Sequence, residues 1–184
     1  RADGTVGGLV GVMLDITDRK RMEDELRQAA AVFESAAEGV IITTPEGSIM
    51  AVNRAFTKIT GYAESEVIGL NPRILQSGRH DSNFYHEMWQ CIARDDRWQG
   101  EIWNRRKNGE IYPESVSISV VRDTQGRVAR YVSTASDISQ QKKNEEQIQV
   151  LAFSDPLTRL PNRRLLHDRL QHALATSSRT KSHG

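Results

Sequence analysis

Two short triplets, one Asp-Ile-Thr and one Asp-Ile-Ser, carry side chains whose types and spacing could make specific hydrogen bonds. Each places a carboxylate two residues before a hydroxyl, Asp15 before Thr17 and Asp137 before Ser139, at the start of a polar segment. Short acidic or hydroxyl side chains at a helix start accept backbone N–H bonds. We therefore predict that Thr17 and Ser139 are N-caps. Asp15 and Asp137 then either complete plain caps or act as signal-transmission residues that join a strand to a helix.

The single cysteine and the balanced charge exclude several classes of protein. Cys91 alone cannot form a disulfide or a zinc cluster within one chain, which fits a reducing, cytoplasmic compartment. The 184 residues carry a net charge of +1, with Lys and Arg interleaved with Asp and Glu, so no broad basic field attracts nucleic acid. The longest apolar run, residues 9–14, is too short to cross a bilayer. The chain begins with Arg1 and without a signal peptide, so we expect a cytoplasmic fragment.

An internal repeat divides the chain. Residues 4–27 match residues 126–149 without a gap, and each copy reads as a Gly turn, a β-rich strand, the Asp-Ile-hydroxyl triplet and a polar helix. We therefore predict that residues 1–16 are the last strand of a preceding copy. Residues 37–138 should then form one complete domain.

The segments 17–36 and 139–153 are predicted to be helices that flank this domain. Their apolar residues follow a narrow seam with spacings of four and three. This spacing is typical of a short parallel coiled coil, although an ordinary amphipathic helix needs a similar stripe. The seam residues are Met22, Leu26, Ala29 and Phe33 in the first segment and, in the second, the polar Asn144 followed by Ile148 and Leu151.

The apolar pattern of the central region predicts strands and short helices. Residues 115–120 alternate between serine and apolar residues, which is typical of a strand with one buried face. Asn53 should cap a short helix, and the Asn108-Gly109 pair predicts a tight hairpin turn. The expected strands are 39–44, 49–52, 98–106, 110–121 and 128–138, with helical turns at 65–75 and a longer helix at 82–93. This order fits an α+β fold in which a five-stranded antiparallel sheet carries helices on one face.

These residues, in this order, resemble the PAS/PAC family of sensory domains over about residues 30–140. The carrying residues are Gly47, Asn53, Phe56, Thr60-Gly61-Tyr62, the Glu66 to Gly69 stretch, Trp98 to Glu101, Asn104 to Gly109 and Asp137-Ile138. The resemblance implies the PAS fold, flanked by N- and C-terminal signalling helices, with a ligand pocket between the sheet and the helices. It also implies a homodimer formed through the PAS domain and its flanking helices.

The tail resembles a second family. Residues 153–164, Phe-Ser-Asp-Pro-Leu-Thr-Arg-Leu-Pro-Asn-Arg-Arg, are similar to the opening of a GGDEF domain, the diguanylate cyclase family, although Arg159 stands where Gly is usual. The resemblance makes residues 154–184 a truncated N-terminus of such a domain. Phosphoryl transfer needs Mg²⁺ ligands and a phosphate cradle, which would lie beyond Gly184. We therefore expect a sensory and dimerisation module, with no catalytic or metal site of its own, that signals to a GGDEF domain further along the same chain; the alternative is a passive dimer scaffold.

Three ligand chemistries known in PAS domains can be compared with the pocket. The stretch from Gly69 to Gln76 resembles that of LOV domains, which form a flavin adduct on cysteine, but Pro72 stands at the cysteine position. Glu114 and Ala135 replace an asparagine and a glutamine of that family. We therefore expect LOV-type FMN adduct chemistry to be disfavoured.

The other two chemistries are a redox-sensing FAD without an adduct and a haem. Similar PAS domains bind FAD, and candidate pocket residues are Asn71, Arg73, Gln76, Trp103 and Asn104; Asn71 and Asn104 could equally satisfy backbone groups, and Trp103 could belong to the core. A haem-binding histidine would fall near Asn83, between His80 and His86, so haem is disfavoured. The sequence leaves the cofactor unknown.

Overall fold

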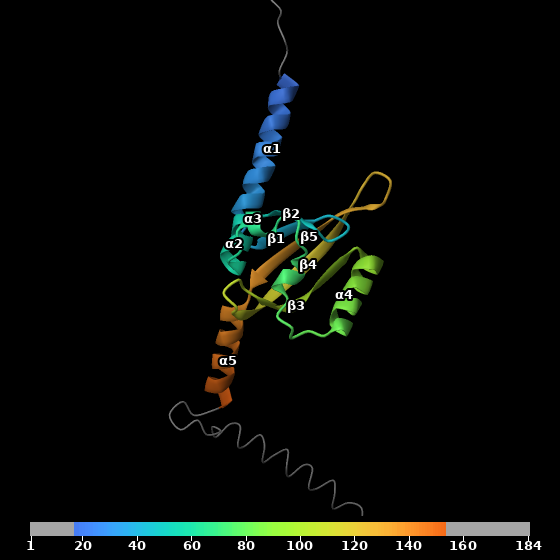
Figure 1. Ribbon diagram of the computed structural model, residues 1–184. Helices are drawn as coiled ribbons and strands as arrows, with labels where there is room; N and C mark the ends of the chain where they lie inside the picture. Colours follow the sequence, from blue (N-terminus) through green and yellow to red (C-terminus); the bar gives the residue numbers. More distant parts are fainter. Residues whose placement is uncertain (1–16, 154–184) are drawn as a thin grey trace, which may run out of the picture.

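A five-stranded antiparallel sheet forms the centre of the molecule, and its strands lie in the order β2-β1-β5-β4-β3. The computed structural model describes residues 17–153, with side chains to residue 148. The elements along the chain (Figure 1) are α1 (Thr17–Ser35), β1 (Gly39–Thr43), β2 (Ile49–Val52), α2 (Arg54–Thr60), α3 (Glu64–Val67), the 3₁₀ helix η1 (Pro72–Leu75), α4 (Ser82–Asp95), β3 (Arg97–Arg105), β4 (Ile111–Arg122), β5 (Val128–Asp137) and α5 (Ser139–Phe153). The predicted α+β architecture is confirmed.

Turns and caps form where the sequence places them. The hairpin between β3 and β4 turns at Gly109, whose φ of 91° lies in the left-handed region that glycine adopts without steric cost. The Asn53 side chain accepts the N–H of Phe56 and caps α2, and Asp81 caps α4 by accepting the N–H of Phe84 at 2.9 Å. These local interactions fix where both helices begin.

Helices cover one face of the sheet and divide the apolar core into two clusters. The first, between β1, β2, α2, α3 and η1, comprises Ile41, Ile49, Val52, Phe56, Val67 and Leu75. The second packs α4 on β3, β4 and β5 and comprises Met88, Ile92, Ile102, Val116 and Ala135. Side chains from both clusters also line a cavity between the sheet and the helices.

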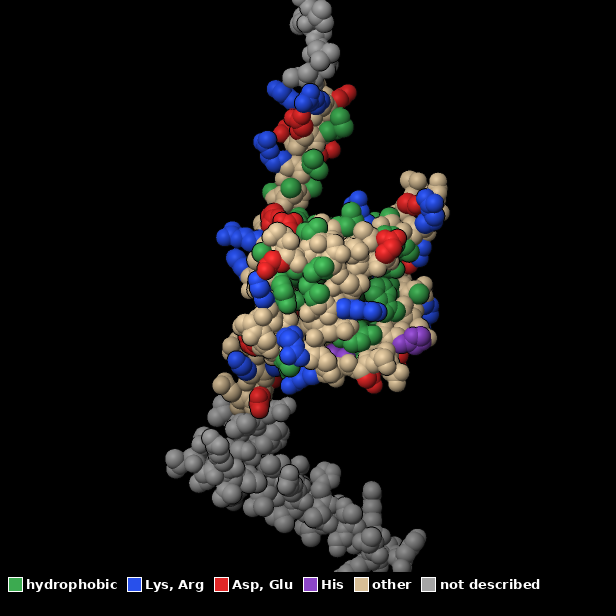
Figure 2. Space-filling model, in the orientation of Figure 1, with side chains coloured by type: hydrophobic (Ala, Val, Ile, Leu, Met, Phe, Trp, Pro, Cys, Tyr) green, Lys and Arg blue, Asp and Glu red, His purple; other side chains and the backbone are tan. Residues whose placement is uncertain are grey.

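The helices α1 and α5 extend from opposite ends of the domain (Figure 1). Helix α1 has no buried residue, and its seam residues Met22 and Leu26 are 63% and 73% exposed. Figure 2 shows green apolar side chains along α1 between charged ones of both signs. These two seam residues are therefore not covered by any other part of residues 17–148, and the coiled-coil pairing stays a prediction.

Several sequence predictions fall outside the described residues. They are the preceding copy at 1–16, which includes Asp15, and the GGDEF-like segment at 154–184. Among the helices of residues 17–153, none has the length and apolar content needed to cross a membrane.

Candidate ligand-binding and signal-transmission sites

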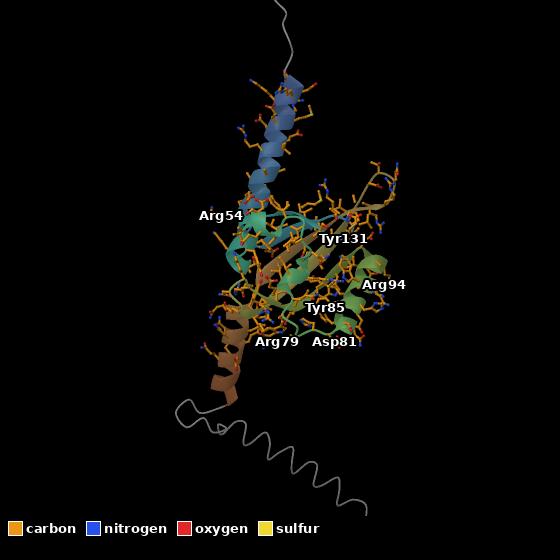
Figure 3. The ribbon with its side chains drawn as sticks, in the orientation of Figure 1. Arg54, Arg79, Asp81, Tyr85, Arg94 and Tyr131 are labelled. Carbon is orange, nitrogen blue, oxygen red and sulfur yellow. The ribbon has the colours of Figure 1, made fainter. Side chains whose placement is uncertain are left out.

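A cavity of about 880 Å³ lies between the inner face of the sheet and the segment that runs from η1 into α4. Its size falls within the roughly 300–1,000 Å³ of small-molecule sites. Apolar side chains such as Leu75, Met88 and Val116 form much of the wall. Tyr85 of α4 and Tyr131 of β5, labelled in Figure 3, line it from the helix side and from the sheet.

Four of the five predicted pocket residues meet at this cavity. Asn71, Arg73 and Gln76 come from the η1 segment and Asn104 from β3. Gln76 and Asn104 form a β-bridge, so backbone pairing joins the two segments. The Arg73 side chain has no hydrogen-bond or ion-pair partner within residues 17–148, and it is exposed at the cavity.

Trp103, the fifth predicted residue, does not line the cavity. Successive side chains of a strand point to opposite faces, and its neighbours Ile102 and Asn104 both face inward. The Trp103 ring instead contacts the Arg79 guanidinium, whose carbon lies 4.0 Å from the ring centroid. The strand alternation could have shown that Trp103 and Asn104 cannot share a pocket.

A buried carboxylate on the sheet, Glu114, is a cavity residue that was noted only as a departure from LOV domains and was not among the predicted pocket residues. Glu114 is 3% exposed and lines the cavity. Its Oε2 accepts from Asn104 Nδ2 at 2.8 Å, and its Oε1 accepts from the Tyr112 hydroxyl at 2.5 Å. Burial raises the pKa of Glu114 above its ordinary value, although both hydrogen bonds act in the opposite direction. The sequence signal was present, because an acidic residue interrupts the inward-facing positions of a strand.

Two histidines line the cavity near the start of α4. His80 Nε2 accepts the backbone N–H of Trp103 at 2.9 Å, so its imidazole is fixed as the Nδ1–H tautomer. The His80 ring also stacks on Phe84, with centroids 4.0 Å apart. His86 pairs instead with Gln90, one turn along the helix, at 2.9 Å.

The predicted transmission residues Asp137 and Ser139 lie where β5 ends and α5 begins. Asp137 Oδ1 accepts the backbone N–H of Ser139 at 2.8 Å, so the carboxylate provides the cap. The Ser139 hydroxyl, predicted to cap, is instead buried and has no hydrogen-bond partner within residues 17–148, because Ser139 is already the first helical residue. Thr17 likewise is the first residue of α1.

An arginine holds Asp137 in place. Arg106 Nη2 lies 2.5 Å from Asp137 Oδ2, and the Arg106 side chain is only 16% exposed. Arg106 also donates to the carbonyl of Ile59 at the end of α2. Burial acts to raise the pKa of Asp137, but hydrogen bonds from Ser139 and Arg106 outweigh it and hold that pKa below its ordinary value. The carboxylate is therefore ionised and bound on both oxygens.

The sheet order, the helices on one face and the internal cavity define a sensory-domain fold, and comparison with known proteins gives its family. The model of the PAS domain matches residues 37–140. The chain therefore belongs to the PAS family, as its sequence motifs indicated. The boundaries predicted for the other segments stay predictions.

Signalling proteins are among the relatives. The chain is 32% identical over 108 residues to a nitrogen fixation regulatory protein of Klebsiella oxytoca, covering 59% of this chain and 22% of that protein. It is 33% identical over 121 residues to a blue-light-activated histidine kinase of Brucella canis, covering 62% and 25%. It thus spans about a quarter or less of these curated relatives. These matches show a sensory, PAS/LOV-type signalling domain.

One solved relative corrects an expectation about the cofactor. A structure described as "Flavin Analogue Sheds Light on Light-Oxygen-Voltage Domain Mechanism" matches with a TM-score of 0.55 and 27% identity, covering 69% of this chain and 98% of that one. The expectation that LOV-type flavin is disfavoured is therefore wrong. That expectation rested on Pro72 and two other replacements, whereas the similarity to LOV domains extends over 69% of this chain and 98% of the LOV structure.

Proposed function

We propose that this chain is a flavin-binding sensory module. The carrying observation is the composition of the cavity wall, where amide side chains, the Arg73 guanidinium and one buried carboxylate converge in an otherwise largely apolar space. A flavin matches this set because it joins a flat apolar ring with an imide N–H and carbonyls to a polar or phosphorylated tail. When bound, it would supply a chromophore and a redox-active ring.

Each polar residue of the cavity has a role that its chemistry suggests. Asn71, Gln76 and Asn104 carry amides, which both donate and accept, and so suit the carbonyls and N–H of a ring edge. Glu114 is an acceptor when ionised and would take a ligand N–H. The Arg73 guanidinium has no partner within residues 17–148, which favours binding of the phosphate or other acidic group of the tail.

Titration of the full chain with riboflavin, FMN and FAD tests this proposal. We expect saturable binding. Flavin fluorescence polarisation and a change in the absorption spectrum measure it. Asn104→Ala should weaken binding about tenfold, since it removes hydrogen bonds worth about 1–1.5 kcal/mol. The matched control Asn108→Ala lies in the exposed hairpin turn and should bind as the wild type does. A folded chain that binds none of the three would overturn the proposal.

For the output, we propose that α5 passes the signal to a GGDEF domain that would begin near residue 154 and make cyclic di-GMP in the longer protein. Support comes from the resemblance of residues 153–164 to that family and from the direct capping of α5 by Asp137. We also propose that the module acts as a cytoplasmic homodimer and has no catalysis of its own. Helix register is then the control point, because two cyclase domains must face each other.

Insertion of one to seven residues after Ser139 in the longer protein tests this output. Each inserted residue rotates the C-terminal part of the helix by about 100°, so activity should vary with a period close to one helical turn. The rate at which GTP is converted to cyclic di-GMP measures this activity. Activity that is independent of insertion length would contradict the mechanism and leave a passive dimer scaffold. Turnover of GTP by the present chain would overturn the assignment as a non-enzyme.

A further inference from the structure

A row of polar side chains crosses the inner face of the sheet from the cavity towards α5. Asn104 of β3, Tyr112 and Glu114 of β4, and Asp137 of β5 lie on three adjacent strands. Asn104 pairs with Tyr112 in register, and Glu114 pairs with Asp137. The row begins at the cavity wall and ends one residue before Ile138, so it connects the cavity to the cap of α5.

Tyr112 joins the cavity carboxylate to a cation. Its hydroxyl donates to Glu114, and its side chain is 1% exposed, so the ring cannot move without displacing its neighbours. The Arg106 guanidinium carbon lies 3.7 Å from the centroid of the same ring. A cation this close to an aromatic face, and shielded from water, is attracted to it. Tyr112 therefore contacts Glu114 with its hydroxyl and Arg106 with its ring.

Arg106 joins this ring to the start of α5. Its ion pair with Asp137 at 2.5 Å and the bond from the Ser139 N–H to Asp137 at 2.8 Å are consecutive. The guanidinium that stacks on Tyr112 is therefore the same group that binds the carboxylate capping α5. Each step is a direct contact between partly or fully buried groups.

We propose that Tyr112 and Arg106 are positioning residues that couple the state of Glu114 in the cavity to the first turn of α5. A ligand N–H that binds Glu114 competes with the Tyr112 hydroxyl for the carboxylate. The ring and the stacked guanidinium then shift together, and the capping of α5 by Asp137 weakens or strengthens. This mechanism rests on the proposed function for its input, but the coupling itself exists without a ligand.

A second route is available through the backbone, and it makes a different prediction. Glu114 and Asp137 are neighbours on paired strands, and the Ile138 N–H donates to the Pro113 carbonyl at 3.1 Å. Through this route a change at Glu114 would reach α5 whether or not the Tyr112 hydroxyl is present. Removal of that hydroxyl alone therefore distinguishes the two routes.

Amide hydrogen exchange of Ser139 and Lys142, measured by ¹⁵N NMR on the full chain without ligand, tests the proposal. The Lys142 N–H bonds to the Ile138 carbonyl, so both amides report on the first turn of α5. We expect Glu114→Gln to change their exchange rates at least about threefold, as for residues coupled in one network. In a Tyr112→Phe background the same substitution should have little effect. An equal effect in both backgrounds, or none in either, would overturn the proposal.

Two further variants keep the test decisive if Tyr112→Phe unfolds. Arg106→Lys retains the charge but loses the planar guanidinium, so it should also uncouple Glu114 from α5. The matched control is Arg122→Lys, which alters the ion pair between Arg122, at the opposite end of β4 from Glu114, and Asp96, the C-cap of α4. In the Arg122→Lys background, Glu114→Gln should still change the amide exchange of Ser139 and Lys142. Coupling that survives Arg106→Lys unchanged would contradict the mechanism. Coupling without any flavin binding would overturn only the proposed ligand.

Discussion

The side-chain amide of Asn53 donates to the backbone carbonyl of Phe33, in the last turn of α1, at 3.1 Å. The same nitrogen donates to the Glu38 carbonyl at 2.9 Å, and the amide oxygen accepts from the N–H groups of Val40 and Phe56. One buried side chain thus holds the end of α1, the start of β1 and the start of α2 together. Most of α1 is exposed, and the Arg54 N–H also donates to the Glu34 carboxylate at 3.1 Å, so these bonds at the end of α1 determine its direction.

We predict that Asn53→Ala lowers the free energy of unfolding by about 3 kcal/mol, because it removes a helix cap and leaves buried backbone groups unpaired. Asn53→Asp keeps the acceptor for Phe56 but faces two carbonyls with a carboxylate, so it should specifically release α1. Urea denaturation measures the first effect, and amide exchange in residues 30–35 measures the second. Asn83→Ala, an exposed change on α4, serves as the control. A loss below about 1 kcal/mol for Asn53→Ala would contradict this role.

If the protein dimerises through α1, a charge placed in the exposed seam of this helix should weaken the dimer. Leu26→Glu should raise the dimer dissociation constant at least tenfold, because a leucine buried in an interface contributes about 1.5–3 kcal/mol. The control Gln28→Glu adds the same charge to a position outside the seam. Sedimentation equilibrium over a range of concentrations compares the two. If both variants dimerise equally, α1 is not the interface.

The buried carboxylate of Glu114 predicts a pH dependence of stability. Its pKa is higher in the folded protein than its ordinary value of 4.5, so the folded state binds more protons. Stability from this group is therefore full below pH 4.5 and falls as the pH rises through the raised pKa. Glu114→Gln cannot ionise, so the wild type should lose stability relative to this variant over that interval.

Urea unfolding of both proteins from about pH 4 to about pH 8 measures the difference. The lowered pKa of Asp137 stabilises the fold above pH 3.8 in both proteins, and the charge of Asp137 also raises the pKa of Glu114, so the difference between the two proteins reports on Glu114 together with this neighbour. Glu87→Gln, an exposed change on α4, serves as the control. A difference between the wild type and Glu114→Gln that does not vary with pH would show that burial does not raise the pKa of Glu114.

The free guanidinium of Arg73 predicts which flavins bind best. Arg73→Gln should weaken the binding of FMN at least tenfold, since a hydrogen bond to a charged group contributes about 1.5–3 kcal/mol. Riboflavin lacks the phosphate, so its affinity should hardly change. Arg79→Gln is the control, because Arg79 stacks on Trp103 outside the cavity lining. If Arg73→Gln lowers the affinities for FMN and riboflavin equally, Arg73 does not bind the phosphate.

Local patterns in the sequence were enough to predict the elements of this protein and their order. Alternation in residues 115–120, the Asn108-Gly109 turn and the cap at Asn53 each depend on residues a few positions apart. The motifs also identified the PAS family. Most of the predicted pocket residues came from one continuous stretch and from the strand that pairs with it, which is why four of the five meet.

The contacts of these residues depend on the tertiary structure. The exclusion of Trp103 from the cavity follows from the direction in which β3 faces the helices. The chain of contacts from Glu114 through Tyr112 and Arg106 to Asp137 joins the cavity wall to the cap of α5. Asp137 is 31 positions from Arg106, and burial decides the pKa of Glu114. Such contacts arise when distant strands pair and exclude water, so they cannot be predicted from local spacing.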